Sequence, residues 1–229
     1  MGVLLLAAFL FGQGERAVEK DLLVVITGPD LKGGAVSQVL WNGDEVLVQG
    51  VFAEAGGGLS PIYFVAPTRD TGLRRLDGLP EGSVATWQRQ SSRTSPTGLG
   101  TITVSSDAKV PMYGVGPQEQ RLADSVNMGG TLTRHIVRLG RLVLHERTGL
   151  EPYDGEVWAW SPAAVNRVAW IDTKGDLWMA EADGRMARRL VRGHFTLPAW
   201  SPDGTALAVA ERKDNGQRWE ISVVRVPAR

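Results

Sequence analysis

The amino-acid sequence predicts an all-β protein built from tandem repeats, and three observations support this. Glycine is abundant, with 28 residues in a chain of 229. Apolar residues fall mostly in short runs bounded by turn residues, which is typical of strands. Trp160 and Trp200 lie 40 residues apart, and a Ser-Pro pair follows each of them. That period is typical of repeats that contain four strands each.

The last repeat is the clearest one. Ser201–Gly204 (SPDG) has the residues of a type I turn, because proline presets φ at the second position and glycine tolerates the last. The apolar run Thr205–Ala210 follows, and a polar turn at Asp214–Gly216 separates it from Trp219–Val226. The same order of tryptophan, apolar run and turn occurs earlier, over Val157–Val191. Both repeats therefore predict antiparallel strands joined by tight turns.

Earlier copies of the repeat are weaker. Trp41 precedes Trp160 by 119 residues, which is close to three periods. We expect Val84–Trp87 to hold the next anchor, and a further anchor beyond residue 120. Residues 91–149 match the repeat poorly, but they contain three expected strands: Thr101–Ser105, Thr131–Val137 and Arg141–His145. Since one such repeat cannot bury both of its faces, the predicted fold class is an all-β propeller of about five four-stranded antiparallel blades.

The last repeat supplies only about three strands before Arg229, judged by the usual four strands of a blade. Leu22–Ile26 is a lone apolar segment well before the first anchor. We therefore expect this N-terminal segment to pair with Trp219–Val226 and to complete the C-terminal blade, which removes an open edge. The alternative is an incomplete ring that stays open or closes by association.

The N-terminus predicts export. Val3–Phe11 is an uninterrupted apolar run, too short to span a bilayer but suited to the apolar region of a secretory signal. Gly12 and Gly14 would place small residues at the cleavage positions. No Lys or Arg precedes the run, so a buried first strand is the alternative. The expected organisation is a leader over residues 1–14 and a propeller domain over 15–229, in the periplasm or outside the cell.

The final repeat carries a family resemblance. Trp200–Gly204 (WSPDG), with the apolar run and Trp219–Val226 after it, resembles the repeat of TolB-like propellers, which are similar to WD-repeat propellers. So does Asp176–Gly184 with the following Ala187–Val191. The resemblance implies an interaction platform at the cell envelope. The same repeat occurs in propeller domains of prolyl-oligopeptidase-like enzymes, so it predicts a module rather than an activity.

Composition argues against several partners. Lys and Arg total 25, as do Asp and Glu, so no basic excess suggests nucleic acid or a membrane surface. The local cluster of Arg188, Arg189 and Arg192 is interpreted as a solvated strand and turn. The chain has no cysteine, which excludes disulfides, thiolate metal sites and a cysteine nucleophile.

No catalytic, cofactor-binding or metal-binding residues are predicted. There is no Gly-x-Ser-x-Gly elbow. His135 and His145 lie in neighbouring expected strands and could meet, but no placed carboxylate completes a metal site. His194 is expected to make a structural hydrogen bond near a turn. The periodic tryptophans are expected to lie in the core rather than in a sugar site.

Two further motifs are interpreted as turns. Asp172–Asp176 (DTKGD) lacks the glutamate and the ligand spacing of a calcium loop, so a hairpin turn is expected. Gly56–Gly58 and Gly114–Gly116 precede no helix, so phosphate binding is not indicated.

Two classes of function therefore stay open. The first is a monomeric, non-catalytic module that holds a protein or peptide at one rim or in the axial funnel. The second is an enzyme or small-ligand sensor with a site in the central channel, or the propeller part of a prolyl-oligopeptidase-like hydrolase. Ionisable side chains converging on the axis would favour the second class, and a mixed or apolar rim would favour the first.

Overall fold

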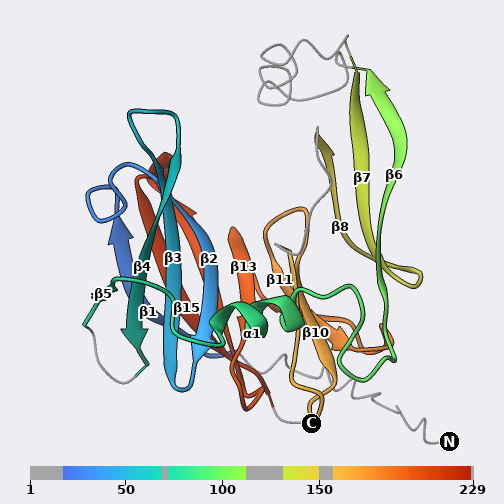
Figure 1. Ribbon diagram of the computed structural model, residues 1–229. Coiled ribbons are helices and arrows are strands. Elements are labelled where there is room, and N and C mark those ends of the chain that lie inside the picture. The colour runs from blue at the N-terminus through green and yellow to red at the C-terminus, as the bar shows by residue number, and fades with distance from the viewer. Residues whose placement is uncertain (1–17, 69–71, 112–130, 150–156, 228–229) are drawn as a thin grey trace, which may run out of the picture.

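The computed structural model describes residues 18–68, 72–111, 131–149 and 157–227 (Figure 1). Within these ranges the chain forms four antiparallel sheets and little helix. The prediction of an all-β protein is therefore confirmed. The expected leader over residues 1–14 lies outside the described residues.

The four sheets are named here A to D in chain order, each written from one edge to the other. Sheet A contains β1 (Lys20–Thr27), β15 (Arg218–Arg225), β14 (Ala206–Lys213) and β13 (Phe195–Trp200). Sheet B contains β2 (Ala35–Asn42), β3 (Glu45–Ala53), β4 (Leu59–Pro67) and β5 (Arg74–Leu76). Sheet C contains β6 (Ile102–Pro111), β7 (Thr131–Leu139) and β8 (Leu142–Gly149). Sheet D contains β12 (Arg188–Val191), β11 (Leu177–Glu181), β10 (Arg167–Ile171) and β9 (Trp158–Trp160).

Sheet A joins the two ends of the described chain. Strand β1 pairs antiparallel with β15, with Ile26 opposite Trp219 and Val25 opposite Glu220. The expected pairing of Leu22–Ile26 with Trp219–Val226 is thus confirmed. The pairing is driven by burial, because Ile26 is fully buried against sheet B.

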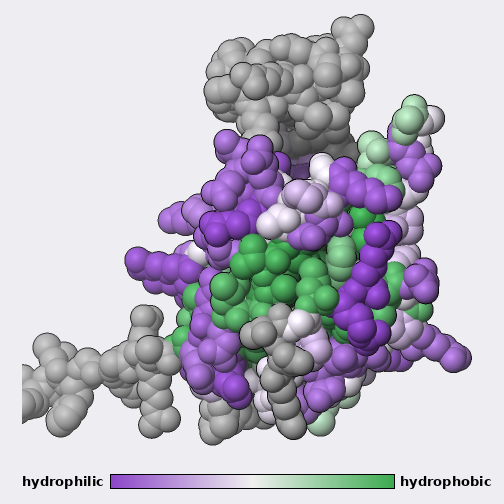
Figure 2. All heavy atoms as spheres, turned by 90° about the vertical axis from the view of Figure 1, so that its left-hand side faces the viewer, coloured by the Kyte–Doolittle hydropathy of each residue, from purple (hydrophilic) through white to green (hydrophobic). Residues whose placement is uncertain are grey.

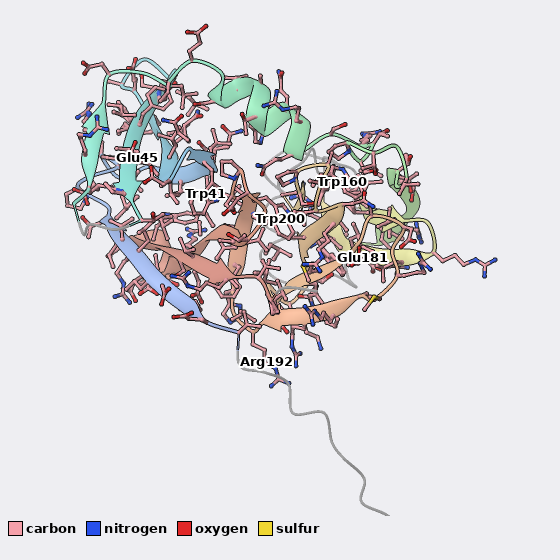
Figure 3. All side chains as sticks on the ribbon, turned by 90° about the horizontal axis from the view of Figure 1, so that it is seen from below. Trp41, Glu45, Trp160, Glu181, Arg192 and Trp200 are labelled. Carbon is pink, nitrogen blue, oxygen red and sulfur yellow. The ribbon has the colours of Figure 1, made fainter. Side chains whose placement is uncertain are left out.

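Apolar cores fill the spaces between neighbouring sheets. One lies between sheets A and B, one between A and D, and one between C and D. The repeat tryptophans are buried in them, as expected: Trp41 in the first, Trp200 in the second and Trp160 in the third. Figure 3 shows these three residues one after another across the centre of the molecule.

The tight turns also follow the sequence. Between β13 and β14, the amide of Gly204 donates to the carbonyl of Ser201 at 2.9 Å, and Gly204 adopts a φ of 69°. Between β10 and β11, the amide of Gly175 donates to the carbonyl of Asp172 at 3.0 Å, and the Asp172 carboxylate accepts the amide of Lys174 at 2.8 Å. Asp172–Asp176 is therefore a hairpin turn, as predicted.

The expectation that Val84–Trp87 anchors a further repeat is wrong. These residues lie in α1 (Ser83–Gln90), which Gly82 precedes in a left-handed conformation. No Ser-Pro turn follows Trp87, and the next residues are good helix formers, so the apolar segment continues as a helix rather than a strand. The described residues contain four sheets where about five blades were expected from the spacing of the repeat. The anchor expected beyond residue 120 falls partly in 112–130, outside the described residues.

A close approach at Gly100 fixes the segment after α1 against sheet D. A Cβ atom at this position would overlap the carbonyl oxygen of Ala182 and lie 2.9 Å from the Trp160 ring. We expect Gly100→Ala to lower the free energy of unfolding by about 1–3 kcal/mol, the usual cost of overpacking. Urea denaturation measures this, with Gly56→Ala as the control because nothing lies within 4 Å of its new Cβ. Equal stability of the two variants would contradict the close packing.

Glu211 of β14 makes the stability depend on pH. Burial raises the pKa of its carboxyl group, but hydrogen bonds from Lys213 at 2.6 Å and Lys20 at 3.3 Å outweigh burial and leave the pKa lowered. A lowered folded-state pKa stabilises the fold above the unfolded value of about 4.3, and this contribution disappears as pH falls through the folded value. Glu211→Gln should therefore be less stable than wild type at neutral pH and converge with it in acid. Urea unfolding across this pH range tests it, with Glu220→Gln of β15 as the control.

Candidate functional site

The repeat tryptophans connect neighbouring sheets through hydrogen bonds. The Trp41 indole N–H donates to the carbonyl of Ala199 in sheet A at 3.0 Å. The Trp200 indole donates to the carbonyl of Ala159 in sheet D at 2.9 Å. Ala199 and Ala159 each precede a repeat tryptophan in their own strand. The same contact thus recurs from sheet B to A and from A to D, and the edge strand β13 is a neighbour of both β2 and β9.

The segment that follows α1 continues this pattern. The Trp160 indole donates to the carbonyl of Ser92 at 2.7 Å, and the Trp158 indole donates to the same carbonyl at 3.1 Å. The side-chain amide of Gln90 binds the main chain of Trp200 twice, donating to its carbonyl and accepting from its amide, both at 2.9 Å. The C-terminal end of α1 is therefore fastened to sheets A and D.

A pocket of about 560 Å³, named here the α1 pocket, lies beside this helix. Its walls are Glu81 to Ser83, Ala85, Thr86, Arg89 and Gln90 of the α1 segment, and the turns that follow Trp41, Trp160 and Trp200. These turns contribute Asn42 and Gly43, Ser161 to Ala163, and Pro202. The pocket is thus built where three repeats meet the helix α1.

The lining of the α1 pocket is mixed. Glu81 and Arg89 supply opposite charges, while Ala85, Pro96 and Pro162 supply apolar surface. Both charged side chains belong to exposed residues. Arg89 donates to the hydroxyl of Thr86 at 3.0 Å. The arrangement suits a side chain or short segment that combines apolar surface with polar groups.

A second, smaller cavity lies between α1 and the strands β2, β9 and β13. It has a volume of about 190 Å³, and Trp87 and Gln90 of α1 lie over strands β2, β9 and β13. Its lining residues are all uncharged, and include Gln38, Leu40, Trp158 and Pro198. The described residues therefore bring no ionisable side chains together in this cavity.

Two of the histidines, His135 and His145, are buried inside the fold. They lie on the neighbouring strands β7 and β8. The Nδ1 atom of His145 is 2.8 Å from the carbonyl oxygen of Ile171. Burial lowers the pKa of His145, and the hydrogen bond to Ile171 opposes this only in part. No group of three or more His, Cys, Asp or Glu residues in the described ranges could hold a metal ion.

His194 and the arginine cluster of Arg188, Arg189 and Arg192 lie in or near sheets A and D. The backbone amide of His194, rather than its side chain, donates to the Glu211 carboxylate at 3.3 Å. Arg188 and Arg189 lie on the edge strand β12, where Arg189 pairs with Asp176 at 3.3 Å. Arg192 is exposed just after that strand.

Of the two glycine motifs, Gly56–Gly58 lies in the connection between β3 and β4, and Gly114–Gly116 lies outside the described residues. Neither motif was expected to bind phosphate. The α1 pocket was not predicted by the sequence. Of the segment Val84–Trp87, which the repeat spacing marks as an anchor, Ala85 and Thr86 line the pocket.

Comparisons with known proteins assign no family. No family model matches the chain, and no curated protein matches it. A solved structure of acylaminoacyl peptidase from Pyrococcus horikoshii is similar over 80% of this chain and 37% of that chain, with 12% sequence identity and a TM-score of 0.22. The chain thus spans little more than a third of that protein, and so slight a likeness shows neither fold nor activity. No helix in the described ranges has the length and apolar character needed to cross a bilayer.

Proposed function

We propose that this protein is a non-catalytic binding module whose sheets are blades of an incomplete TolB-like β-propeller. The 40-residue spacing of Trp160 and Trp200 supports the repeat. The hydrogen bonds from Trp41 to Ala199 and from Trp200 to Ala159 support a common centre for the blades. In this architecture α1 and the segment after it occupy the place of a further blade.

The observation that carries the function is the α1 pocket. Turns from three repeats and one helix converge on it, and its lining combines Glu81 and Arg89 with prolines and alanines. Such a mixed rim matches the criterion for a protein or peptide platform. The uncharged lining of the smaller central cavity gives no support to a reaction in the channel. We place a peptide segment of a protein partner in the α1 pocket.

The proposed setting is the cell envelope or the exterior. The apolar run Val3–Phe11, followed by Gly12 and Gly14, supports an exported protein, and the chain has no cysteine that oxidation would affect there. A monomer is the simplest form of such a platform.

A displayed peptide library, selected on the full chain, tests the pocket. The readout is the affinity of each selected peptide for two variants of α1. Ala85→Arg fills the pocket with a long side chain, and it should weaken binding by at least about tenfold, as expected for an obstructed centre of an interface. Gln88→Arg is the matched control, because Gln88 is exposed on the same helix but does not line the pocket.

The proposal is supported if the selected peptides no longer bind the Ala85→Arg variant but still bind the Gln88→Arg variant. If no peptide is selected, or if the selected peptides bind both variants as well as wild type, the α1 pocket is not the binding site. Circular dichroism of both variants confirms that the comparison is made between folded proteins, since arginine is a good helix former at either position.

A further inference from the structure

A larger hollow, named here the β1 groove, lies next to the α1 pocket. It has a volume of about 850 Å³ and runs between one end of sheet A and the turn that joins β2 to β3. Trp41, Gly43 and Pro202 line both the groove and the α1 pocket. The two hollows are thus neighbours on either side of these residues, so a segment seated in one can continue into the other.

The groove has an apolar floor. Leu22 of β1 is 56% exposed, which is high for a leucine on a strand, and it lines the groove. Leu23, Ala206 and Val223 line it as well, and they are the partly buried margin of the core between sheets A and B. Figure 2 shows hydrophobic side chains gathered in the middle of the face on which β1, β4 and β5 lie, with hydrophilic ones around them.

The charges around this floor are mostly negative. Asp21, Asp44 and Asp203 line the groove, together with one cation, Arg225. Arg225 is already paired, because its Nε atom lies 3.1 Å from a Glu19 carboxylate oxygen and 3.7 Å from one of Asp21. Asp44 and Asp203 also line the groove, and neither forms an ion pair with a cation among the described residues.

The two unmatched carboxylates are held differently. One carboxylate oxygen of Asp203 accepts hydrogen bonds from the Ser201 hydroxyl at 2.6 Å and from the Thr205 amide at 3.1 Å, and the other accepts from the Thr205 hydroxyl at 2.8 Å. These hydrogen bonds, and the bond from Ser201 most of all, lower the pKa of Asp203. Asp44 is exposed in the β2–β3 turn, and only its backbone carbonyl is engaged, by the Thr68 hydroxyl at 2.8 Å.

We infer that the partner segment held by the α1 pocket continues into the β1 groove and places a lysine or arginine there. This inference rests on the proposed function. The aliphatic stem of the basic side chain packs on Leu22 and its cation meets Asp44 and Asp203, which is how long basic side chains bury their stems while keeping their charge near polar groups. The structure thus selects a peptide with a basic residue beside an aliphatic one, and disfavours an acidic one.

The test uses the peptides selected on the wild-type chain and a graded series at Asp44. Asp44→Asn removes one charge and should weaken binding about threefold, in the range of exposed ion pairs. Asp44→Lys replaces the attraction by a repulsion and should weaken binding more, by about tenfold. Asp77→Lys makes the same reversal at an exposed residue outside the groove and should have no effect. A glutamate in place of the peptide's basic residue should restore binding to Asp44→Lys alone.

The outcomes separate this inference from the proposed function. If Ala85→Arg abolishes binding while the Asp44 series leaves it unchanged, the α1 pocket stands and the β1 groove is not used. If neither position matters, both proposals fail. The Asp44 effect should also shrink in high salt, because the interaction of exposed charges is screened. An Asp44 effect equal to that of Asp77→Lys would reveal a general charge effect and overturn the inference.

Discussion

Removing strand β1 should abolish cooperative folding. A chain without residues 1–27 loses Ile26, which is fully buried in the core between sheets A and B, and leaves one edge of β15 unpaired. It also removes Lys20, whose Nζ atom lies 3.3 Å from the buried Glu211 carboxylate. Truncating one buried isoleucine costs about 2–5 kcal/mol, and a whole domain has only about 5–15 kcal/mol of stability. The loss of the entire strand should therefore exceed what the fold can withstand.

Thermal unfolding followed by circular dichroism measures the effect of this deletion. The control lacks only residues 1–17 and keeps β1, so it should retain a sharp transition. A peptide with the sequence of residues 18–27, added in excess, should restore the transition of the shorter chain by pairing with β15. A sharp transition of the shorter chain without the peptide would show that β1 is dispensable.

A large loss of stability is also expected when Trp200 is replaced. Its side chain is fully buried between sheets A and D, and its indole donates to the carbonyl of Ala159. Trp200→Ala should lower the free energy of unfolding by about 3–5 kcal/mol, since it leaves a large cavity. It also removes the hydrogen bond from the indole to that carbonyl, which joins sheets A and D.

A pair of conservative replacements isolates the hydrogen bond. Trp219 is buried too, but its indole nitrogen has no hydrogen-bond partner. Trp200→Phe should therefore cost about 0.5–1.5 kcal/mol more than Trp219→Phe, because only the former removes a hydrogen bond between two sheets. Urea denaturation of the two variants measures the difference. Equal losses would show that tryptophan volume, and not the bond between sheets, stabilises the fold.

The sequence predicted those parts of the fold that depend on local chemistry. The Ser201–Gly204 turn, the hairpin at Asp172–Asp176 and the buried repeat tryptophans follow from residue type and period. The pairing of β1 with β15 was predicted because the last repeat lacked a strand and Leu22–Ile26 lacked a partner. The turns and the buried tryptophans depend on a few neighbouring residues, and the pairing of β1 with β15 follows from the number of strands that a repeat needs.

The rest depends on contacts that are distant in the chain. Val84–Trp87 has the apolar and aromatic residues of a strand anchor, but no turn follows Trp87 and the next residues are good helix formers. The α1 pocket combines turns after Trp41, Trp160 and Trp200 with that helix, so no linear motif could indicate it. The carboxylates of the β1 groove likewise come together only when sheet A meets the β2–β3 turn.

The hydrogen bond between Gln90 and Trp200 makes the Trp200 amide sensitive to whether α1 is bound to sheet A. At the free edge of β13 a side chain, not another strand, accepts the Trp200 amide proton. The rate at which that proton exchanges with deuterium is therefore set by how often α1 detaches from β13, and not by unfolding of the sheet. A ligand in the α1 pocket that holds α1 against β13 would slow the exchange of this single amide and leave the exchange of the strand amides unchanged. Binding to the pocket could then be followed without labelling the ligand.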